Sequence, residues 1–248
     1  MREIENEFLV AAELHSPERL RSALEAGIDA RAPLRGKRPL QWLVEMYTRS
    51  DRFPHCVQLL LEHGAELDDP STRAVLLDDG ELLARELVER PGLLAHRTTL
   101  RSAFTPLEGV SLLHVAAEFG HARVATVLLA HGADVEARAE LDELGLGGQT
   151  PLFHTVNSHA NRSAVLMQLL LDAGARTDVR LAGLVWGRGF EWETTFFDVT
   201  PISYAQFGSL PQMHRDELQL RANVEALLAA AGRRVPPRNN LPNRYLAR

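Results

Sequence analysis

The stretch SLLHVAAEFGHARVATVLLAHGADVEAR, residues 111–138, decides the fold of this chain. It contains two short segments with apolar residues at helical spacing, LLHVAAEFG and ARVATVLLAHG. The pair Gly120-His121 predicts the turn between the two helices. Gly132 predicts the end of the second helix, because glycine is suited to the left-handed position just past a helix end. Neither helix can bury its apolar face alone, so the pair predicts further helical units packed on both sides.

This pattern resembles the ankyrin repeat family, in which two helices are followed by an extended finger. His114 stands at the family's Thr-Pro-Leu-His position, and the string Leu-Leu-x-x-Gly recurs loosely along the chain. The resemblance implies an all-α ankyrin-repeat solenoid of about six helix-turn-helix units with β-hairpin fingers. The expected single domain, residues 1–235, has units at about 3–31, 36–68, 71–95, 108–138, 147–179 and 197–235.

Two segments depart from the family pattern. In residues 180–199, alternating Trp, Phe and Thr around Gly187 and Gly189 predict one larger β-hairpin insertion. Residues 236–248 form a tail rich in Pro and Asn, which we expect to be extended, with Tyr245 and Leu246 against the last helices. These departures look like features of a bacterial subgroup of ankyrin proteins with divergent repeats.

Composition and charge restrict the class of protein. The net charge of −6 argues against a general nucleic-acid-binding surface, which requires an excess of Lys and Arg. The single cysteine, Cys56, allows no internal disulfide and fits a reducing compartment. The N-terminal sequence lacks the apolar core of a leader, and no stretch is long and apolar enough for a membrane helix. We therefore expect a cytoplasmic protein that binds neither nucleic acid nor membranes.

Ten histidines invite the hypothesis of a metal site, but the repeat accounts for several of them. His114 and His121 occupy positions at which the ankyrin family uses histidine. His63 and His131 lie at helix ends, where a cation suits the helix dipole. No metal-ligand motif, P-loop or dinucleotide-binding glycine pattern is present, so we expect no metal and no cofactor.

Polar and aromatic residues that the repeat does not require mark a candidate binding site in the fifth unit, the hairpin and the sixth unit. Its predicted members are His154, Asn157, His159, Asn161, Arg162, Trp186, Arg188, Glu191, Trp192, Glu193, Tyr204 and Gln206. An alternative interpretation is that the turn residues bond the free backbone groups of their own loop, and that the tryptophans cover an exposed flank.

The resemblance implies a protein-interaction scaffold, an adaptor or an inhibitor, which would dock one protein partner on the concave face of the fifth and sixth repeats. The alternative is a small-molecule or enzymatic pocket formed by His154, the turn at 157–162 and the hairpin at 186–193. There, a histidine beside Glu191 or Glu193 would act as a general base. An open surface favours the first hypothesis, and a narrow pocket in which His154 and a carboxylate converge favours the second.

Overall fold

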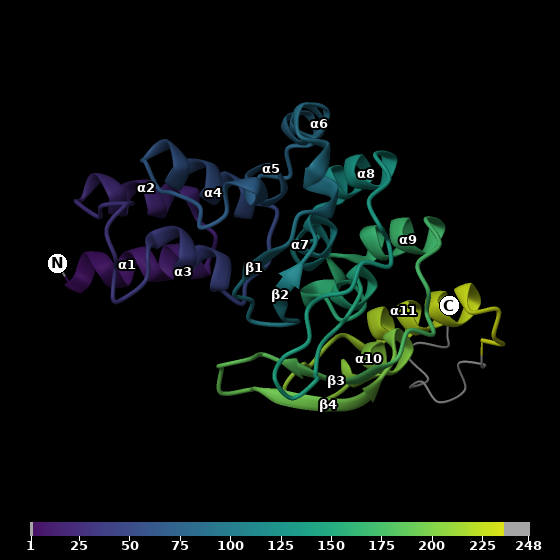
Figure 1. Cartoon of the computed structure of the whole chain (residues 1–248). Coiled ribbons are helices and arrows are strands. Elements are labelled where there is room, and N and C mark those ends of the chain that lie inside the picture. The colour runs from purple at the N-terminus through teal and green to yellow at the C-terminus, as the bar shows by residue number, and fades with distance from the viewer. Residues whose placement is uncertain (1, 236–248) are drawn as a thin grey trace.

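The computed structural model describes residues 2–235, and the predicted tail at 236–248, with Tyr245 and Leu246, lies outside the described residues. Helices follow one another in pairs from the N-terminal end towards the C-terminal end (Figure 1). The α-helices are α1 (Arg2–Glu13), α2 (Pro17–Glu25), α3 (Pro39–Glu45), α4 (Phe53–Glu62), α5 (Arg73–Leu76), α6 (Gly80–Glu89), α7 (Leu112–Phe119), α8 (Ala122–Ala130), α9 (Ala164–Asp172), α10 (Pro201–Phe207) and α11 (Glu217–Ala230). Most helices contact their neighbour in the chain, as α1 contacts α2 and α7 contacts α8. Several pairs also contact the next pair, as α2 contacts α4 and α6 contacts α8.

Local signals in the sequence explain where several helices begin and end. The Ser16 hydroxyl accepts a hydrogen bond from the backbone N–H of Arg19, and Pro17 opens α2, as expected for an N-cap followed by proline. Gly120 ends α7 in the left-handed conformation at φ 72° and ψ 28°. Gly132, which follows the C-cap His131 of α8, also has a positive φ, 84°. The predicted glycine ends of both helices are therefore confirmed.

The apolar faces of successive helices form one continuous hydrophobic core. Side chains from both helices of each pair contribute to it, which is how short helices that cannot bury a face alone become stable. Its fully buried members include Phe8, Leu20, Leu43, Leu60, Leu83, Leu113, Leu128, Leu170 and Leu227.

Two small antiparallel sheets interrupt the helical pairs. Strands β1 (Thr98–Leu100) and β2 (Leu107–Val110) lie between α6 and α7. Strands β3 (Leu181–Trp186) and β4 (Thr194–Val199) form a longer hairpin, with Leu181 opposite Val199 and Trp186 opposite Thr194. Figure 1 shows this hairpin running beneath the later helices and reaching back towards the N-terminal half.

The prediction of an all-α solenoid of about six units is wrong. Residues 2–235 are 49% helical and also contain 10% strand, in small antiparallel sheets. The β-branched residues Thr98 and Thr99 favour a strand between the expected third and fourth units, where the repeat pattern predicted neither a helix nor a strand. In addition, the predicted helix pair is incomplete in two units. α5 has only four residues, and the fifth unit begins with a 3-10 turn, η3 (Pro151–His154), in place of an α-helix.

Further 3-10 turns, η1 (Pro70–Thr72), η2 (Pro91–Ala95) and η4 (His159–Asn161), lie in the connections. In η4, Ala160 and Asn161 have positive φ values of 49° and 54°. The turn at residues 157–162, the enlarged turn of the fifth unit, therefore cannot continue as a regular helix. The enlarged turn lies against the segment before α11, and this packing positions the site described below.

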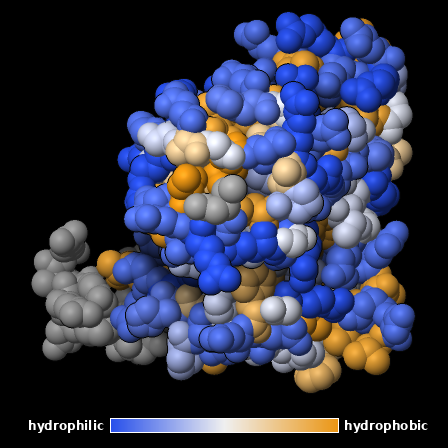
Figure 2. All heavy atoms as spheres, turned by 90° about the vertical axis from the view of Figure 1, so that its left-hand side faces the viewer, coloured by the Kyte–Doolittle hydropathy of each residue, from blue (hydrophilic) through white to orange (hydrophobic). Residues whose placement is uncertain are grey.

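The surface at the N-terminal end is mostly hydrophilic, with hydrophobic residues gathered in smaller areas (Figure 2). Val10 and Leu14 of the first helical pair are 37% and 55% exposed. Within residues 2–235, no helix has the length and apolar character needed to cross a membrane.

Candidate functional site

An open groove of about 570 Å³ lies where the hairpin meets the end of α3 and the segment before α11. Its walls carry four aromatic side chains, contributed by segments that are far apart in the sequence. The residues on which the argument below depends are Tyr47, Phe104, His159, Trp186, Trp192 and Arg215. Two other hollows are larger, about 760 and 830 Å³, but neither contains a tryptophan.

Trp192 joins the hairpin to the N-terminal half of the molecule. Its ring meets the ring of Tyr47 edge-on, with centroids 6.1 Å apart and planes at 88°, and it stacks on Phe190 at 4.7 Å. The indole N–H donates to the backbone carbonyl of Ala103 at 3.2 Å. Gly187 makes this position possible, because a Cβ atom there would lie 2.5 Å from Cδ1 of Trp192. The hairpin turn therefore holds Trp192 at the wall of the groove.

The floor of the groove is formed by Trp186 and Phe104. Their rings stack with centroids 6.0 Å apart and planes at 19°, and Trp186 is only 2% exposed. The backbone N–H of Gly187 donates to the carbonyl of Phe104 at 2.9 Å, which fixes the hairpin against the segment before β2. Such stacked rings give a rigid apolar surface at little entropic cost.

Arg215 brings a positive charge to the groove. Its Nε donates to the carbonyl of Asn157 at 2.9 Å and its Nη1 to the carbonyl of Met213 at 3.0 Å. The guanidinium carbon lies 5.3 Å from the centroid of the Phe104 ring. Nη2 is buried, and no described residue accepts a hydrogen bond from it. Burial lowers the pKa of Arg215, because the charged form loses hydration.

His159 lies at the edge of the groove in the enlarged turn of the fifth unit. Burial, followed by the charges of Arg215, Arg49 and Arg162, lowers its pKa. The neutral imidazole is therefore the favoured form near neutral pH, and it can both donate and accept a hydrogen bond.

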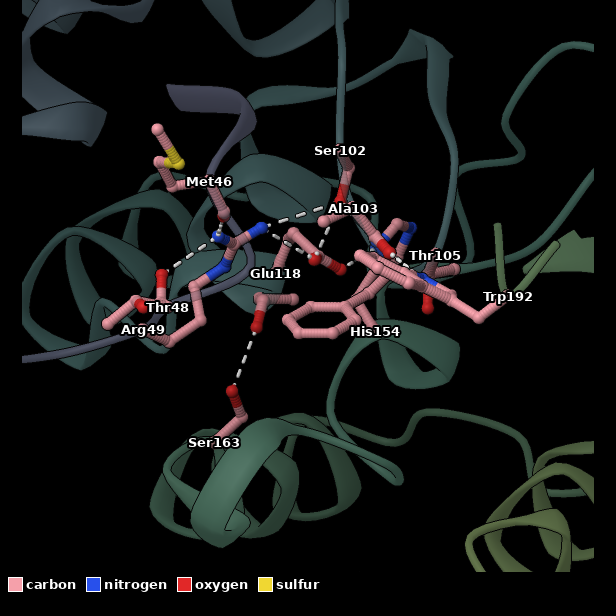
Figure 3. A network of polar contacts seen from close by, with 12 residues as sticks. Met46, Thr48, Arg49, Ser102, Ala103, Thr105, Glu118, His154, Ser163 and Trp192 are labelled. Carbon is pink, nitrogen blue, oxygen red and sulfur yellow. Dashed lines mark hydrogen bonds and ion pairs between the residues drawn. The ribbon is translucent and has the colours of Figure 1, made fainter. Parts of the chain in front are cut away.

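Figure 3 shows a buried polar network, whose Arg49 lies over the ring of Phe104 in the groove. The Glu118 carboxylate accepts hydrogen bonds from Nη2 of Arg49 at 3.2 Å and from the Ser102 hydroxyl at 2.8 Å, and its second oxygen lies 2.9 Å from Nδ1 of His154. The side chains of Arg49 and Glu118 are each 3% exposed, and that of His154 is 0% exposed. The network thus connects α7 to the segments on both sides of it.

Burial alone would raise the pKa of Glu118. The hydrogen bond from His154 and the charge of Arg49 outweigh it, and the pKa lies below its usual value. The carboxylate is therefore ionised and paired in the folded protein. Such a network can orient helices, but its reactive groups are closed off from solvent.

The structure brings only part of the predicted site together. His159, Trp186 and Trp192 line the groove. Three predicted residues are buried instead. His154 bonds Glu118, the Asn157 amide donates to the carbonyl of Tyr204, and the Tyr204 hydroxyl lies 2.9 Å from Thr105.

The other predicted residues are separated from the groove. Arg188 pairs with Glu108 and Asp142, and this holds the hairpin to neighbouring loops. Arg162 pairs with Asp51. The Glu193 carboxylate accepts a hydrogen bond from the backbone N–H of Gly189 in its own loop. Glu191 and Gln206 are exposed on the surface.

Asn161 accepts a hydrogen bond from the Asn223 amide at 2.8 Å, which ties the enlarged turn to α11. Asn161 therefore bonds a side chain of α11, whereas the alternative interpretation expected it to bond the backbone of its own loop. Arg49, Tyr47, Phe104, Glu118 and Arg215 were not predicted. For Arg215 the sequence contains one signal, the long polar stretch SLPQMHRD, residues 209–216, within the expected sixth unit.

Within residues 2–235, no group of three or more His, Cys, Asp or Glu side chains has a metal-binding arrangement. The histidines of the repeat make other contacts. His114 lies 3.1 Å from the carbonyl of Gln149, and His121 lies 2.7 Å from the carbonyl of Val75. Both rings are buried, and burial lowers the pKa of each.

Comparison with protein families gives one match, to the ankyrin repeat model, over residues 108–140. A comparison with characterised proteins gives no match. The matched segment contains α7 and α8, whose first helix carries Glu118. An ankyrin repeat is typical of protein-interaction modules, so the match supports that class of protein.

Proposed function

We propose that this protein is a non-catalytic interaction scaffold, an adaptor or an inhibitor, which docks a protein partner in the groove lined by Tyr47, Trp192 and Arg215. The observation that carries the proposal is the gathering of four aromatic rings and one arginine around one open hollow. Aromatic residues and arginine dominate the binding energy of protein interfaces. The ankyrin match over residues 108–140 supports the same class of function.

The site is preorganised for binding. Trp186 is packed against Phe104, and Trp192 is fixed by its stacking on Phe190 and its hydrogen bond to Ala103. A partner therefore meets rings that are already ordered, and little free energy is spent on immobilising them. The single buried cysteine, Cys56, is the basis for placing this activity in the cytoplasm.

The rival hypothesis of an enzymatic pocket places His154 or His159 as a general base beside Glu191 or Glu193. His159 lines the groove, but neither glutamate is among the residues that line it. His154 and a carboxylate do converge, but on each other in the core, with His154 2% exposed. A general base must reach the proton of a bound substrate, and His154 is not among the residues that line the groove.

A photo-crosslinking amino acid in place of Gln212, an exposed residue that lines the groove, tests the proposal. The same amino acid in place of Val165, which is 66% exposed on α9, is the matched control. We expect a specific crosslinked protein from position 212 only, and we expect it to be lost when Trp192→Ala is added. Equal crosslinking from both positions, unaffected by Trp192→Ala, would exclude this groove as the docking site.

A further inference from the structure

The charges around Phe104 do not balance. Arg49 and Arg215 lie with their guanidinium carbons 5.2 and 5.3 Å from the centroid of this ring. The two cations face one carboxylate, that of Glu118, which accepts a hydrogen bond from Arg49. Glu118 also attracts Arg215, but only at a distance, and Arg215 forms no ion pair with any carboxylate of residues 2–235. One positive charge therefore remains at the wall of the groove without a paired anion.

The hydrogen bonds of Arg215 orient its charge without neutralising it. Both of its acceptors, the carbonyls of Asn157 and Met213, are neutral. Nη2 has no acceptor among the described residues, although it is buried. An arginine that is partly buried without a counterion is costly, and the cost is recovered when an anion pairs with it. The guanidinium is thus held in place by the protein. Nη2 is closed to solvent, so a ligand can meet Arg215 only where this partly exposed residue lines the groove.

The other ionisable groups at the groove do not supply the missing anion. Asp216 is nearest in the sequence, but its carboxylate caps α11 by accepting the backbone N–H groups of Leu218 and Gln219, each at 3.0 Å. The remaining groups are His159, His214 and Tyr47. The histidines carry no negative charge, and the Tyr47 hydroxyl keeps its proton near neutral pH because its hydrogen bond to Glu13 raises its pKa. The bound partner has to bring the anion.

We propose, resting on the docking function above, that the partner enters this groove with a peptide segment that carries a carboxylate next to an aromatic or large aliphatic side chain. The carboxylate, from Asp, Glu or a chain terminus, pairs with Arg215, because it brings the negative charge that no ion pair within residues 2–235 supplies to this guanidinium. The apolar side chain packs on Trp192 and Tyr47, whose rings meet edge-on at the wall of the groove. A volume of about 570 Å³ suits a few side chains of one segment rather than a folded surface.

A library of random linear peptides displayed on phage and selected on the immobilised full-length protein tests this inference. The same library is selected on Arg215→Gln, Arg215→Lys and Trp192→Ala. Thermal unfolding of each variant establishes that it is folded. Arg215→Lys keeps the charge but loses the planar guanidinium, so it separates the need for charge from the need for the guanidinium.

We expect the natural sequence to enrich peptides in which an acidic residue lies next to an apolar one. Synthetic versions of these peptides should bind Arg215→Gln roughly tenfold or more weakly. Their affinity for Arg215→Lys should be intermediate, and replacing the acidic residue of the peptide by its amide should cost no further affinity in Arg215→Gln.

Two outcomes would overturn the inference, and they can be told apart. If the enriched peptides need Trp192 but contain no acidic residue, the groove is still the docking site, but the inference of a carboxylate in the partner is contradicted. If no peptide is enriched, or if the enriched peptides are recovered equally well on Trp192→Ala, the proposed docking function is contradicted as well.

Discussion

Nδ1 of His154 lies 2.9 Å from Oε2 of Glu118, and both side chains are closed to solvent. Glu118 belongs to the segment that matches the ankyrin repeat, whereas His154 belongs to the next unit. The other oxygen of Glu118 accepts from Arg49, which follows α3. One carboxylate thus ties three separate parts of the chain together. Its partner Arg49 lies over the Phe104 ring, so the network supports the groove rather than forming its surface.

Glu118→Gln should be strongly destabilising. The substitution leaves Arg49 buried beside a neutral amide, and an uncompensated buried charge costs about 3–5 kcal/mol. The free energy of unfolding from urea titrations should fall by an amount of that order. Glu191→Gln, at an exposed position, is the matched control and should change it by less than about 0.5 kcal/mol. Similar small effects in the two variants would show that the buried pair contributes little to stability.

Acid should destabilise the protein through its buried histidines. Burial, and then the charge of Arg49, lowers the pKa of His15 from 6.5 to about 4. The unfolded chain binds a proton at His15 as the pH falls below 6.5, whereas the folded chain does so only near pH 4. The contribution of His15 to the free energy of unfolding is therefore fully present above pH 6.5 and is lost between pH 6.5 and 4. Below pH 4 it does not change further. The loss from this residue is about 3 kcal/mol at most.

His15→Asn isolates this contribution. His15 has a positive φ of 47°, a conformation that asparagine tolerates, and the amide can replace the contact of the ring with Ser50. Unfolding free energies measured at pH 7 and pH 4 should differ less in the variant than in the natural sequence. Part of the difference should persist, because burial also lowers the pKa of His114 and His121. An unchanged difference would mean that His15 does not carry the effect.

Gly187→Ala should displace Trp192 from the wall of the groove. Gly187 and Gly189 lie in the same hairpin turn with φ values of 68° and 81°, so alanine strains the backbone by about 1–2 kcal/mol at either position. Only at Gly187 does the added Cβ meet the Trp192 ring, 2.5 Å from Cδ1. At Gly189 the nearest atom is 3.4 Å away, in the Arg101 side chain.

The comparison of the two alanine variants therefore isolates the effect of the indole position. We expect Gly187→Ala to shift the tryptophan fluorescence to longer wavelength and to weaken partner crosslinking from position 212. Gly189→Ala should change stability by a similar amount and leave both signals close to those of the natural sequence. If the two variants show the same fluorescence shift and the same crosslinking, Gly187 is not the residue that positions Trp192.

Local chemistry made part of this structure predictable. The positive φ values of Gly120 and Gly132 follow from the need for a left-handed residue after a helix. The site was harder to predict, because it is assembled from residues far apart in the sequence. Tyr47 and Trp192 lie in contact through packing that no periodicity encodes. For the same reason the sequence could not show that His154, a polar residue outside the repeat pattern, pairs with Glu118 in the core.

Tyr204 shows the same difficulty, and a double-mutant cycle can measure its role. It was predicted to face a ligand, but it is fully buried, and its hydroxyl lies 2.9 Å from that of Thr105. Tyr204→Phe should lower the free energy of unfolding by about 1–3 kcal/mol, because the Thr105 hydroxyl is left buried without this partner.

Thr105→Val, made in the natural sequence and in Tyr204→Phe, completes the cycle. Since removing both hydroxyls leaves neither buried group unsatisfied, the double variant should lose clearly less than the sum of the two single losses, with a coupling energy of about 1 kcal/mol. Peptides selected on the groove should bind Tyr204→Phe as they bind the natural sequence, because the hydroxyl is directed into the core. A loss of peptide affinity without a loss of stability would show that Tyr204 takes part in binding.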